Sequence, residues 1–557
     1  MVEYGSNEIE IFAVDKSVNR NRGSLELVFD YNTEITGIDI ISPEDDISDV
    51  DTSNVTFKWS GGNDEDGDTV FVELLYGTSK TSLNKKITGI NCDTLDLTEE
   101  LKSYTEYFWQ VVAYSKVYPD TVKSSIYSFR TKAVPPVIIS QSDENIDLDI
   151  GERIILRVSA TGNPKPSYKW EKNGTVISGE TDDSLVIDDA SLTDSGGYVV
   201  QLNNEGGTII SDTIDLRVIY PVKIAAGKNH SLILKNDGTL FGCGLNDIGQ
   251  LGCKTTTENQ NTLVKIMDDV HSIDAGDGHS LIIKNNGTLY ACGNNNHGQL
   301  GNNTTDNQKM PVEIAKNVKT VAAGSVHSLI VKNDGTMLAC GWNGEGQLGD
   351  TTTEDKSTPV EIMRNISSVA AGGGHSLIVK NDGTLFTCGL NSSGQLGDTV
   401  FNLNHPVEIM ENVKTVAAGA RHSLIIKDDG NLFTCGWNGF WQLGDGSGNS
   451  QIFPVEIMNG IRTVSAGFYH SLILGNDGTL FVCGRNIYGQ LGDLVAQYET
   501  PEEIMKDVKA IAAGESHSLI LKNDGTLLAC GWNYNGQLGD GTTEDKYIPV
   551  QIIPKQN

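Results

Sequence analysis

The chain has 557 residues, with 41 Lys and Arg against 73 Asp and Glu, so its formal net charge is −32. This length exceeds what one hydrophobic core holds, and we expect several domains. So acidic a chain repels phosphate backbones, which argues against a nucleic-acid partner. No run of 18 apolar residues occurs, so membrane insertion is not expected.

Residues 1–40 contain two runs of alternating apolar and polar residues, Ile9–Val14 and Leu25–Tyr31. The alternation predicts two strands, but 40 residues are few for an independent domain. We interpret 1–40 as a partial β segment, or the tail of a preceding domain. The sequence does not show whether Met1 is the natural start. The N-terminus has neither a basic segment nor an apolar stretch, so either the protein is cytoplasmic or its export leader is absent from this chain, and we expect the second.

Residues 41–133 show the strand spacing of a β-sandwich, with apolar runs at Val55–Trp59, Val70–Tyr76 and Tyr107–Ala113 separated by turn residues. Trp59, together with the Leu-x-x-x-Thr-x-Tyr pattern that ends at Tyr107, resembles the fibronectin type III module. The resemblance implies that the Tyr107 hydroxyl makes a hydrogen bond at a strand corner.

An acidic loop inside this module gathers three oxygen donors, Asp64, Asp66 and Asp68. Calcium is bound by six to eight oxygen ligands, so these aspartates are candidate calcium ligands. The spacing differs from the EF-hand loop, because the glycine comes too early and no distal glutamate follows. The alternative interpretation is a solvated acidic turn.

Residues 134–220 resemble an immunoglobulin-like domain, through Trp170 and the Asp-Ser-Gly-Gly-Tyr stretch at 194–198. Val158 and Val200 stand where that family has its two bridging cysteines. The domain therefore lacks the inter-sheet disulfide and roughly 2–4 kcal/mol of cross-link stabilisation. Tandem modules of this kind serve mostly as spacers or adhesion units in extracellular proteins, so we expect an extracellular or cell-surface location.

From Val222 to the C-terminus one phrase is repeated seven times. The third copy reads Val-Ala-Ala-Gly at 321–324, His-Ser-Leu-Ile-Val-Lys at 327–332 and Cys-Gly-Trp-Asn at 340–343. A histidine recurs every 47 to 49 residues, at His230, His279, His327, His375, His422, His470 and His517. A cysteine follows each histidine by thirteen residues, at Cys243, Cys292, Cys340, Cys388, Cys435, Cys483 and Cys530. So long a fixed period is typical of a solenoid or propeller.

Each period has the pattern of short antiparallel strands. Alternating apolar runs are separated by Asn-Asp-Gly, which supplies the positive-φ residues of a tight hairpin. Three or four such strands per period make a propeller blade. The predicted fold is therefore all-β, a seven-bladed β-propeller over 221–557 preceded by two β-sandwich domains.

The repeat also resembles a known family. The phrases Ala-Gly-x-x-His-Ser-Leu, Asn-Asp-Gly and Cys-Gly-x-Asn-x-x-Gly-Gln-Leu-Gly are similar to the repeat of the regulator of chromosome condensation family, over residues 222–557. The resemblance implies a seven-bladed β-propeller. Some members are guanine-nucleotide exchange factors, and some secreted bacterial members inhibit β-lactamases.

The repeated histidines and cysteines are expected to be structural. Equivalent atoms on adjacent blades lie about 10 Å apart, whereas a metal–nitrogen bond needs about 2 Å, so the histidines cannot share one ion. We expect each histidine to hydrogen-bond to the backbone of its own blade, and each repeated cysteine to be a small buried core residue. No disulfide is expected, and no C-x-x-C metal pair occurs.

Positions that vary inside a near-identical repeat are the best candidates for function, because the fold acts equally on all blades. The varying residues between Gly and His, after Cys-Gly and before Gly-Gln fall at one rim of the ring. Aromatic residues and arginine, which anchor protein interfaces, concentrate there on the later blades. The alternative is neutral drift on solvated loops. The candidate partner-binding residues are Trp342, Arg421, Trp437, Phe440, Trp441, Phe468, Tyr469, Arg485, Tyr488, Trp532 and Tyr534.

The sequence contains no nucleophile elbow, phosphate loop or paired-carboxylate constellation, so we expect no enzyme activity and no cofactor apart from the candidate calcium. We expect a monomeric, non-enzymatic, secreted or cell-surface bacterial-type scaffold that binds a protein of unknown identity. The propeller rim would be the recognition face and the sandwich modules the stalk. The alternatives are a guanine-nucleotide exchange factor for a small GTPase and a surface structural repeat protein.

Overall fold

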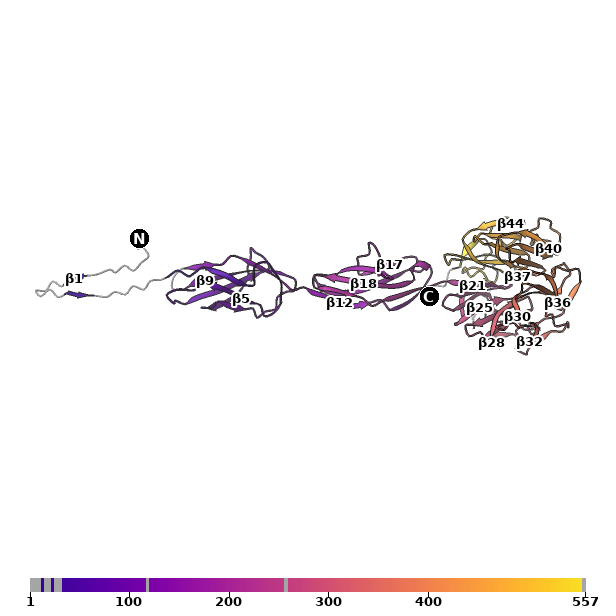
Figure 1. The fold of residues 1–557 in the computed structure, drawn as a ribbon, viewed down its shortest axis with the longest axis horizontal. Coiled ribbons are helices and arrows are strands. Elements are labelled where there is room, and N and C mark those ends of the chain that lie inside the picture. The colour runs from indigo at the N-terminus through magenta and orange to yellow at the C-terminus, as the bar shows by residue number, and fades with distance from the viewer. Residues whose placement is uncertain (1–11, 15–21, 25–32, 117–119, 255–258, 553–557) are drawn as a thin grey trace. The chain divides into compact units, whose positions relative to one another are not determined.

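The computed structural model describes residues 12–14, 22–24, 33–116, 120–254 and 259–552 (Figure 1). The regular elements among them are β-strands and one 3-10 turn, η1 (Leu192–Asp194). No helix in the described ranges has the length and apolarity to cross a membrane. The predicted all-β class is confirmed.

The N-terminal segment contains one short described hairpin. β1 (Phe12–Val14) pairs antiparallel with β2 (Arg22–Ser24). The predicted strand at 25–31 and the start of the predicted strand at 9–14 lie outside the described residues.

The first sandwich consists of two sheets around an aromatic core. Its larger sheet has the order β4-β11-β9-β6-β7, with β10 paired to β9, and its smaller sheet the order β3-β5-β8. The core includes Phe57, Trp59 and Trp109, each at most 2% exposed, as well as Ile35. Because β3 starts at Ile38 and Ile35 is in the core, this sandwich begins a few residues before the expected residue 41. The strands are β3 (Ile38–Ser42), β4 (Ile47–Val50), β5 (Thr56–Gly61), β6 (Val70–Gly77), β7 (Lys85–Ile90), β8 (Thr94–Asp96), β9 (Glu106–Ser115), β10 (Thr121–Lys123) and β11 (Tyr127–Thr131).

The second sandwich has a three-stranded sheet, β12-β14-β17, and a larger sheet, β13-β20-β18-β15-β16, with β19 paired to β18. Val158 and Val200 are fully buried at the positions that would otherwise hold cysteines, beside the buried Trp170. The Trp170 indole donates to the Asp182 carbonyl at 2.9 Å. The strands are β12 (Val134–Gln141), β13 (Asn145–Asp149), β14 (Ile154–Asn163), β15 (Ser167–Lys172), β16 (Thr175–Val176), β17 (Ser184–Ile187), β18 (Gly196–Asn204), β19 (Gly207–Ile210) and β20 (Ile214–Ile219).

The C-terminal part is a seven-bladed propeller, and each blade is a four-stranded antiparallel sheet with its strands in sequence order. The first strands, nearest the axis, are β21 (Pro221–Ala226), β25 (Val270–Ala275), β29 (Val318–Ala323), β33 (Ile366–Ala371), β37 (Val413–Ala418), β41 (Ile461–Ala466) and β45 (Val508–Ala513). The second strands are β22 (His230–Lys235), β26 (His279–Lys284), β30 (His327–Lys332), β34 (His375–Lys380), β38 (His422–Lys427), β42 (His470–Gly475) and β46 (His517–Lys522).

The third strands are β23 (Leu240–Leu245), β27 (Leu289–Gly293), β31 (Met337–Gly341), β35 (Leu385–Leu390), β39 (Leu432–Gly436), β43 (Leu480–Arg485) and β47 (Leu527–Gly531). The outer strands are β24 (Asn259–Met267), β28 (Gln308–Ala315), β32 (Lys356–Met363), β36 (Asn402–Met410), β40 (Gln451–Met458), β44 (Gln497–Met505) and β48 (Lys546–Gln551).

The ring closes without exchanging a strand between its ends. Blade 1 (β21–β24) and blade 7 (β45–β48) are each one continuous segment of the chain. β21 lies against β45 and β46. At this junction Ser231 Oγ lies 3.0 Å from His517 Nε2, and the Gly541 amide donates to the Asn261 carbonyl at 2.7 Å. Side-chain and loop contacts therefore close the toroid.

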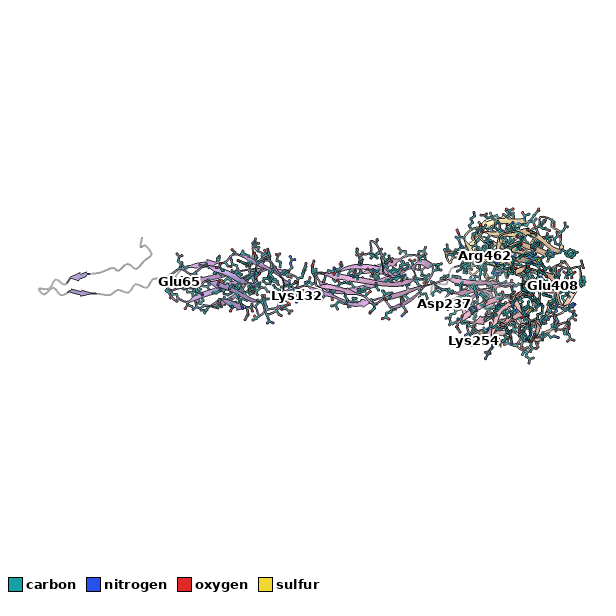
Figure 2. All side chains as sticks on the ribbon, viewed as in Figure 1. Glu65, Lys132, Asp237, Lys254, Glu408 and Arg462 are labelled. Atoms are coloured by element: carbon teal, nitrogen blue, oxygen red, sulfur yellow. The ribbon has the colours of Figure 1, made fainter. Side chains whose placement is uncertain are left out.

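Antiparallel pairing gives each blade two distinct ends. The Ala-Gly-x-x-His turn between the first and second strands and the long loop between the third and fourth strands lie at one end, which we call the loop face. The Asn-Asp-Gly turn and the link to the next blade lie at the other end, the turn face. Asp237, labelled in Figure 2, belongs to the turn of blade 1. The neighbouring Asn236 amide donates to the Tyr220 carbonyl at 2.9 Å, so the chain enters the propeller at the turn face.

Candidate partner-binding face of the propeller

A ring of histidine–serine hydrogen bonds joins the blades beneath the loop face. His327 Nε2 lies 3.0 Å from Ser376 Oγ of the next blade, and Ser376 donates its hydroxyl proton to the Gln347 carbonyl at 2.7 Å. Because that proton is used, the imidazole Nε2–H must be the donor to the serine. The seven pairs, at 2.9 to 3.1 Å, are His230–Ser280, His279–Ser328, His327–Ser376, His375–Ser423, His422–Ser471, His470–Ser518 and His517–Ser231.

This ring corrects the expected role of the repeated histidines. We expected each imidazole to bond to the backbone of its own blade, but its partner is the serine of the neighbouring blade. The imidazoles are fully buried, and burial lowers the pKa of His327 to about 3 and that of His375 to about 4. The ring is therefore neutral at physiological pH and holds adjacent blades together.

The repeated cysteines are buried, as predicted, and also contact the neighbouring blade. Cys340 is fully buried, and its Sγ lies 3.5 Å from the Gln299 carbonyl of the preceding blade. All nine cysteines of the chain are free. Burial raises the pKa of the Cys340 thiol to about 12, so this thiol is inert and structural.

Buried amides make the long loops of the loop face rigid. In blade 5, Asn438 Oδ1 accepts the Leu443 amide at 3.0 Å and Gln442 Oε1 accepts the Phe440 amide at 3.1 Å. Asn438 and Gln442 are fully buried. The repeated Asn and Gln therefore hold the loop, while the variable residues between them carry the side chains that differ from blade to blade.

The two variable residues between Gly and His point to different places. The first residue of each pair lines a small cavity on the propeller axis, together with the preceding Ala-Gly: Lys228, Asp277, Ser325, Gly373, Ala420, Phe468 and Glu515. In this cavity Lys228 Nζ lies 3.4 Å from Glu515 Oε2, and burial raises the pKa of Asp277 to about 6. The second residue lies farther from the axis, where Tyr469 contacts the long loop of the preceding blade.

The structure brings eight of the predicted residues into one group on blades 5 to 7. The ring centroids of Trp437, Phe440 and Tyr469 lie 5.2 Å from one another, each pair in an edge-to-face arrangement. Trp532 lies 6.1 Å from Tyr488 and is stacked on Tyr534 at 6.4 Å. We call this group the aromatic cluster: Trp437, Phe440, Phe468, Tyr469, Arg485, Tyr488, Trp532 and Tyr534.

Arg485 joins the two halves of the aromatic cluster. Its guanidinium carbon lies 4.8 Å from the Phe440 ring centre, 5.6 Å from that of Tyr469 and 5.9 Å from that of Tyr488. Cations are attracted to aromatic faces at these distances. The cluster is half-buried, apart from Tyr534, which is 69% exposed. It is therefore a partly buried group of side chains on the predicted rim.

Three predicted residues lie outside the aromatic cluster. Trp342, on blade 3, contacts the His297 ring of blade 2 at 6.4 Å. Arg421 is exposed in the turn beside Trp437, and its backbone carbonyl accepts the Trp437 amide. Trp441 has a φ of 60°, at a position where other copies have a glycine. Its indole lies against Gly448, so closely that a Cβ added to this glycine would be 3.0 Å from Trp441 Nε1, and Trp441 therefore packs on its own loop.

Sequence reasoning missed a set of exposed apolar side chains on blades 4 to 7. They lie in the long loops of blades 4 and 6 and at the start of the outer strands of blades 5 and 7. The signal was apolar pairs, as at 400–401 and 494–495, where other copies carry polar residues. The apolar area of the loop face is therefore larger than its aromatic residues suggest. These side chains are Val400, Phe401, Ile452, Phe453, Leu494, Val495, Tyr547 and Ile548.

The candidate calcium ligands converge in the first sandwich. One carboxylate oxygen from each of Asp64, Asp66 and Asp68 lies within 4.8 Å of the others, and Glu65, labelled in Figure 2, belongs to the same loop. The Thr33 amide donates to Asp66 Oδ2 at 2.8 Å. Hydrogen bonding between the two carboxyls raises the pKa of Asp64 and lowers that of Asp66. Calcium binding stays a prediction, and a calorimetric titration with calcium of the wild type and Asp66→Asn tests it.

Comparisons with known proteins agree with this architecture. The family model of the RCC1-like domain matches residues 199–409 and 351–556 of the sequence, and the family model of the immunoglobulin domain matches residues 135–204. Human WBSCR16 is similar in structure, with a TM-score of 0.50, 24% identity, and coverage of 55% of this chain and 88% of that one. Prp20p from Saccharomyces cerevisiae has a TM-score of 0.48, 22% identity, and coverage of 65% and 93%.

Two curated relatives each match a short part of the chain. Hemicentin-1 of Homo sapiens is 30% identical over 120 residues, which are 20% of this chain and 2% of that protein. The neuronal cell adhesion molecule of Rattus norvegicus is 32% identical over 96 residues, 15% of this chain and 8% of that protein. The chain thus spans less than a tenth of the length of these two relatives. The two matches to the RCC1-like domain together cover residues 199–556, which is more than half of the chain. The protein therefore belongs to the family of proteins with an RCC1-like domain.

Proposed function

We propose that this chain is a monomeric, non-enzymatic protein-binding scaffold at the cell surface or outside the cell. The aromatic cluster on the loop face would hold the partner, and the sandwich modules would serve as a stalk. The proposal rests mainly on one observation: aromatic residues and an arginine gather on three adjacent blades of an otherwise regular ring.

The composition and rigidity of the aromatic cluster suit protein recognition. Trp, Tyr and Arg supply most of the binding energy at protein interfaces. The buried amides of each loop fix the backbone that carries these side chains, as Asn486 Oδ1 does by accepting the Leu491 amide at 2.7 Å in blade 6. A preorganised surface loses little conformational entropy on binding, which favours tight association.

The proposed location rests on the N-terminal modules. Residues 135–204 match the model of the immunoglobulin domain, and part of the chain is similar to the neuronal cell adhesion molecule, whose name states a role in cell adhesion. The fibronectin type III assignment of the first sandwich is part of the proposal. Its Tyr107 hydroxyl accepts the Lys102 amide at 3.1 Å, the corner hydrogen bond that the resemblance implied.

Capture experiments with matched variants test the proposal. The full chain is used as bait, alongside a double variant, Trp437→Ala with Tyr534→Ala. Trp342→Ala is the control, because Trp342 has the same repeat position as Trp437 but lies outside the aromatic cluster. We expect proteins captured by the wild type and the control to be lost with the double variant. Identical capture by all three baits would remove the assignment of the aromatic cluster.

Nucleotide exchange is the alternative that a direct assay separates. The repeat length varies by only two residues, which leaves little room for an inserted wedge that would distort a nucleotide site. We therefore expect no acceleration of nucleotide release from a panel of small GTPases. Acceleration that depends on the loop face would assign the chain to the exchange factors instead.

A further inference from the structure

Among the residues that the structure describes, the cation Arg485 has no anionic partner, although the chain is strongly acidic. Its Nε–H is buried and has no hydrogen-bond partner among the described residues. Within the described ranges no carboxylate lies within ion-pair distance of its guanidinium, although the chain has 73 Asp and Glu. A buried N–H of a charged group that stays unpaired costs free energy, and a bound anion would remove that cost.

Lys228, a second cation near aromatic rings of the propeller, has the carboxylate partner that Arg485 lacks. Lys228, in the axial cavity, lies 3.4 Å from Glu515 Oε2 and 5.6 Å from the Phe468 ring centre. Arg485 has ring contacts of the same kind but lacks the carboxylate. Arg421, exposed beside Trp437, also forms no ion pair with any residue that the structure describes.

We propose that the aromatic cluster recognises an acidic side chain, Asp or Glu, presented by a protein partner between apolar residues. The carboxylate would bind the Arg485 guanidinium while the flanking apolar residues pack on Trp437, Trp532 and Tyr534. This inference rests on the proposed function and names the chemistry of the partner.

The geometry favours a single carboxylate over other anions. A guanidinium covered by aromatic rings is weakly hydrated, and its planar donors match the two oxygens of a carboxylate. The acidic residues Glu515 and Asp277 line the axial cavity, and they would repel a doubly charged phosphate more strongly than a singly charged carboxylate. Exposed apolar side chains in the long loops of blades 4 and 6, such as Leu494 at 77% and Phe401 at 72% exposure, suit a folded or peptide partner with apolar neighbours.

Peptide selection tests this without knowledge of the natural partner. Twelve-residue peptides displayed on phage are selected in parallel on the full-length wild type and on the full-length Arg485→Gln variant. We expect selection on the wild type to enrich peptides with Asp or Glu flanked by apolar or aromatic residues. Selection on Arg485→Gln should show no such enrichment. The best wild-type peptide is then synthesised with its acidic residue and with the matching amide.

Affinities of the two peptides give a double-mutant cycle. On the wild type the amide peptide should bind roughly 10- to 100-fold more weakly, the range of a charge-assisted hydrogen bond, and on Arg485→Gln the two peptides should bind equally. Arg485→Lys keeps the charge but not the planar donors, so its preference for the acidic peptide over the amide peptide should be intermediate between those of the wild type and Arg485→Gln. The peptide exchange leaves the protein unaltered, so misfolding of a variant cannot mimic the result.

The failures can be told apart. Peptides that need Trp437 and Tyr534 but carry no acidic residue and ignore Arg485→Gln would overturn this inference and leave the proposed function standing. If every selected peptide binds the Trp437→Ala, Tyr534→Ala double variant as tightly as the wild type, both this inference and the proposed function are overturned. Binding of acidic glycans, but not of peptides, through Arg485 would overturn the assignment to a protein partner.

Discussion

The serine after each repeated histidine joins adjacent blades through two buried hydrogen bonds. Ser376 accepts from His327 Nε2 and donates to the Gln347 carbonyl, so one hydroxyl joins a side chain and a backbone group of the preceding blade. All three groups are away from water. A buried polar group costs little when it is paired and much when its partner is removed.

Ser376→Ala should therefore destabilise the propeller by about 1–3 kcal/mol, because it leaves His327 Nε2–H without an acceptor. The Gln347 carbonyl would keep only the weaker Cys388 thiol, 3.5 Å away. Urea unfolding monitored by tryptophan fluorescence measures the difference. Ser393→Ala is the control, because that hydroxyl makes no hydrogen bond with a described residue, and its effect should stay within about 0.5 kcal/mol. Equal effects of the two variants would show that the histidine–serine bond adds nothing.

At the scale of the element, seven buried histidines give the propeller a defined response to acid. Burial holds the pKa of His327 near 3, whereas an unfolded histidine titrates near 6.5. Between these values the unfolded chain binds more protons than the folded one, so stability is present above pH 6.5 and falls as the pH drops. Each histidine of the ring adds to this loss.

His327→Gln should reduce this pH dependence by about one proton, or about 1.4 kcal/mol per pH unit between pH 6 and 4.5. The variant should be less stable than the wild type at pH 7. His271→Gln is the control, because His271 is an exposed histidine outside the histidine–serine ring. Unfolding free energies measured at several pH values decide this, and an unchanged slope in His327→Gln would contradict a buried neutral imidazole.

The strands of the propeller could be predicted from sequence because each period contains the apolar runs and turn residues of its own blade. The alternating runs and Asn-Asp-Gly turns predicted the strands, and seven copies predicted the ring. The period contains no direct sign of contacts between blades, so the partner of His327 was predicted wrongly. For the same reason the position of Arg485 among rings from two loops and a turn could not be predicted. Trp441 was placed with the other aromatics because a single sequence does not reveal a left-handed backbone.

At the scale of the whole molecule, the propeller is a ring with one discontinuous junction. Blades 1 and 7 lack the covalent link that joins every other adjacent pair, and Ser231 with His517 lies at that junction. Apolar packing supports it, with Ile233 of blade 1 and Leu519 and Leu538 of blade 7 in one buried cluster.

Ser231→Ala should open the ring locally, because it weakens the one junction that no covalent link holds. Native-state hydrogen exchange should speed up in β21–β22 and β45–β46, with little change in blades 3 and 4. Ser376→Ala makes the same chemical change at a covalently linked junction and should not cause selective opening of blades 1 and 7. Uniform acceleration over all blades in Ser231→Ala would show that the ring unfolds only as a unit.

The most direct test of the central claim is a hydrogen-exchange footprint of the full chain bound to a captured partner protein. Our account predicts protection at the loop face of blades 5 to 7, at 437–441, 467–469, 485–490 and 532–536, and none at the Asn-Asp-Gly turns. Protection confined to the turn face or to the sandwich modules would contradict it.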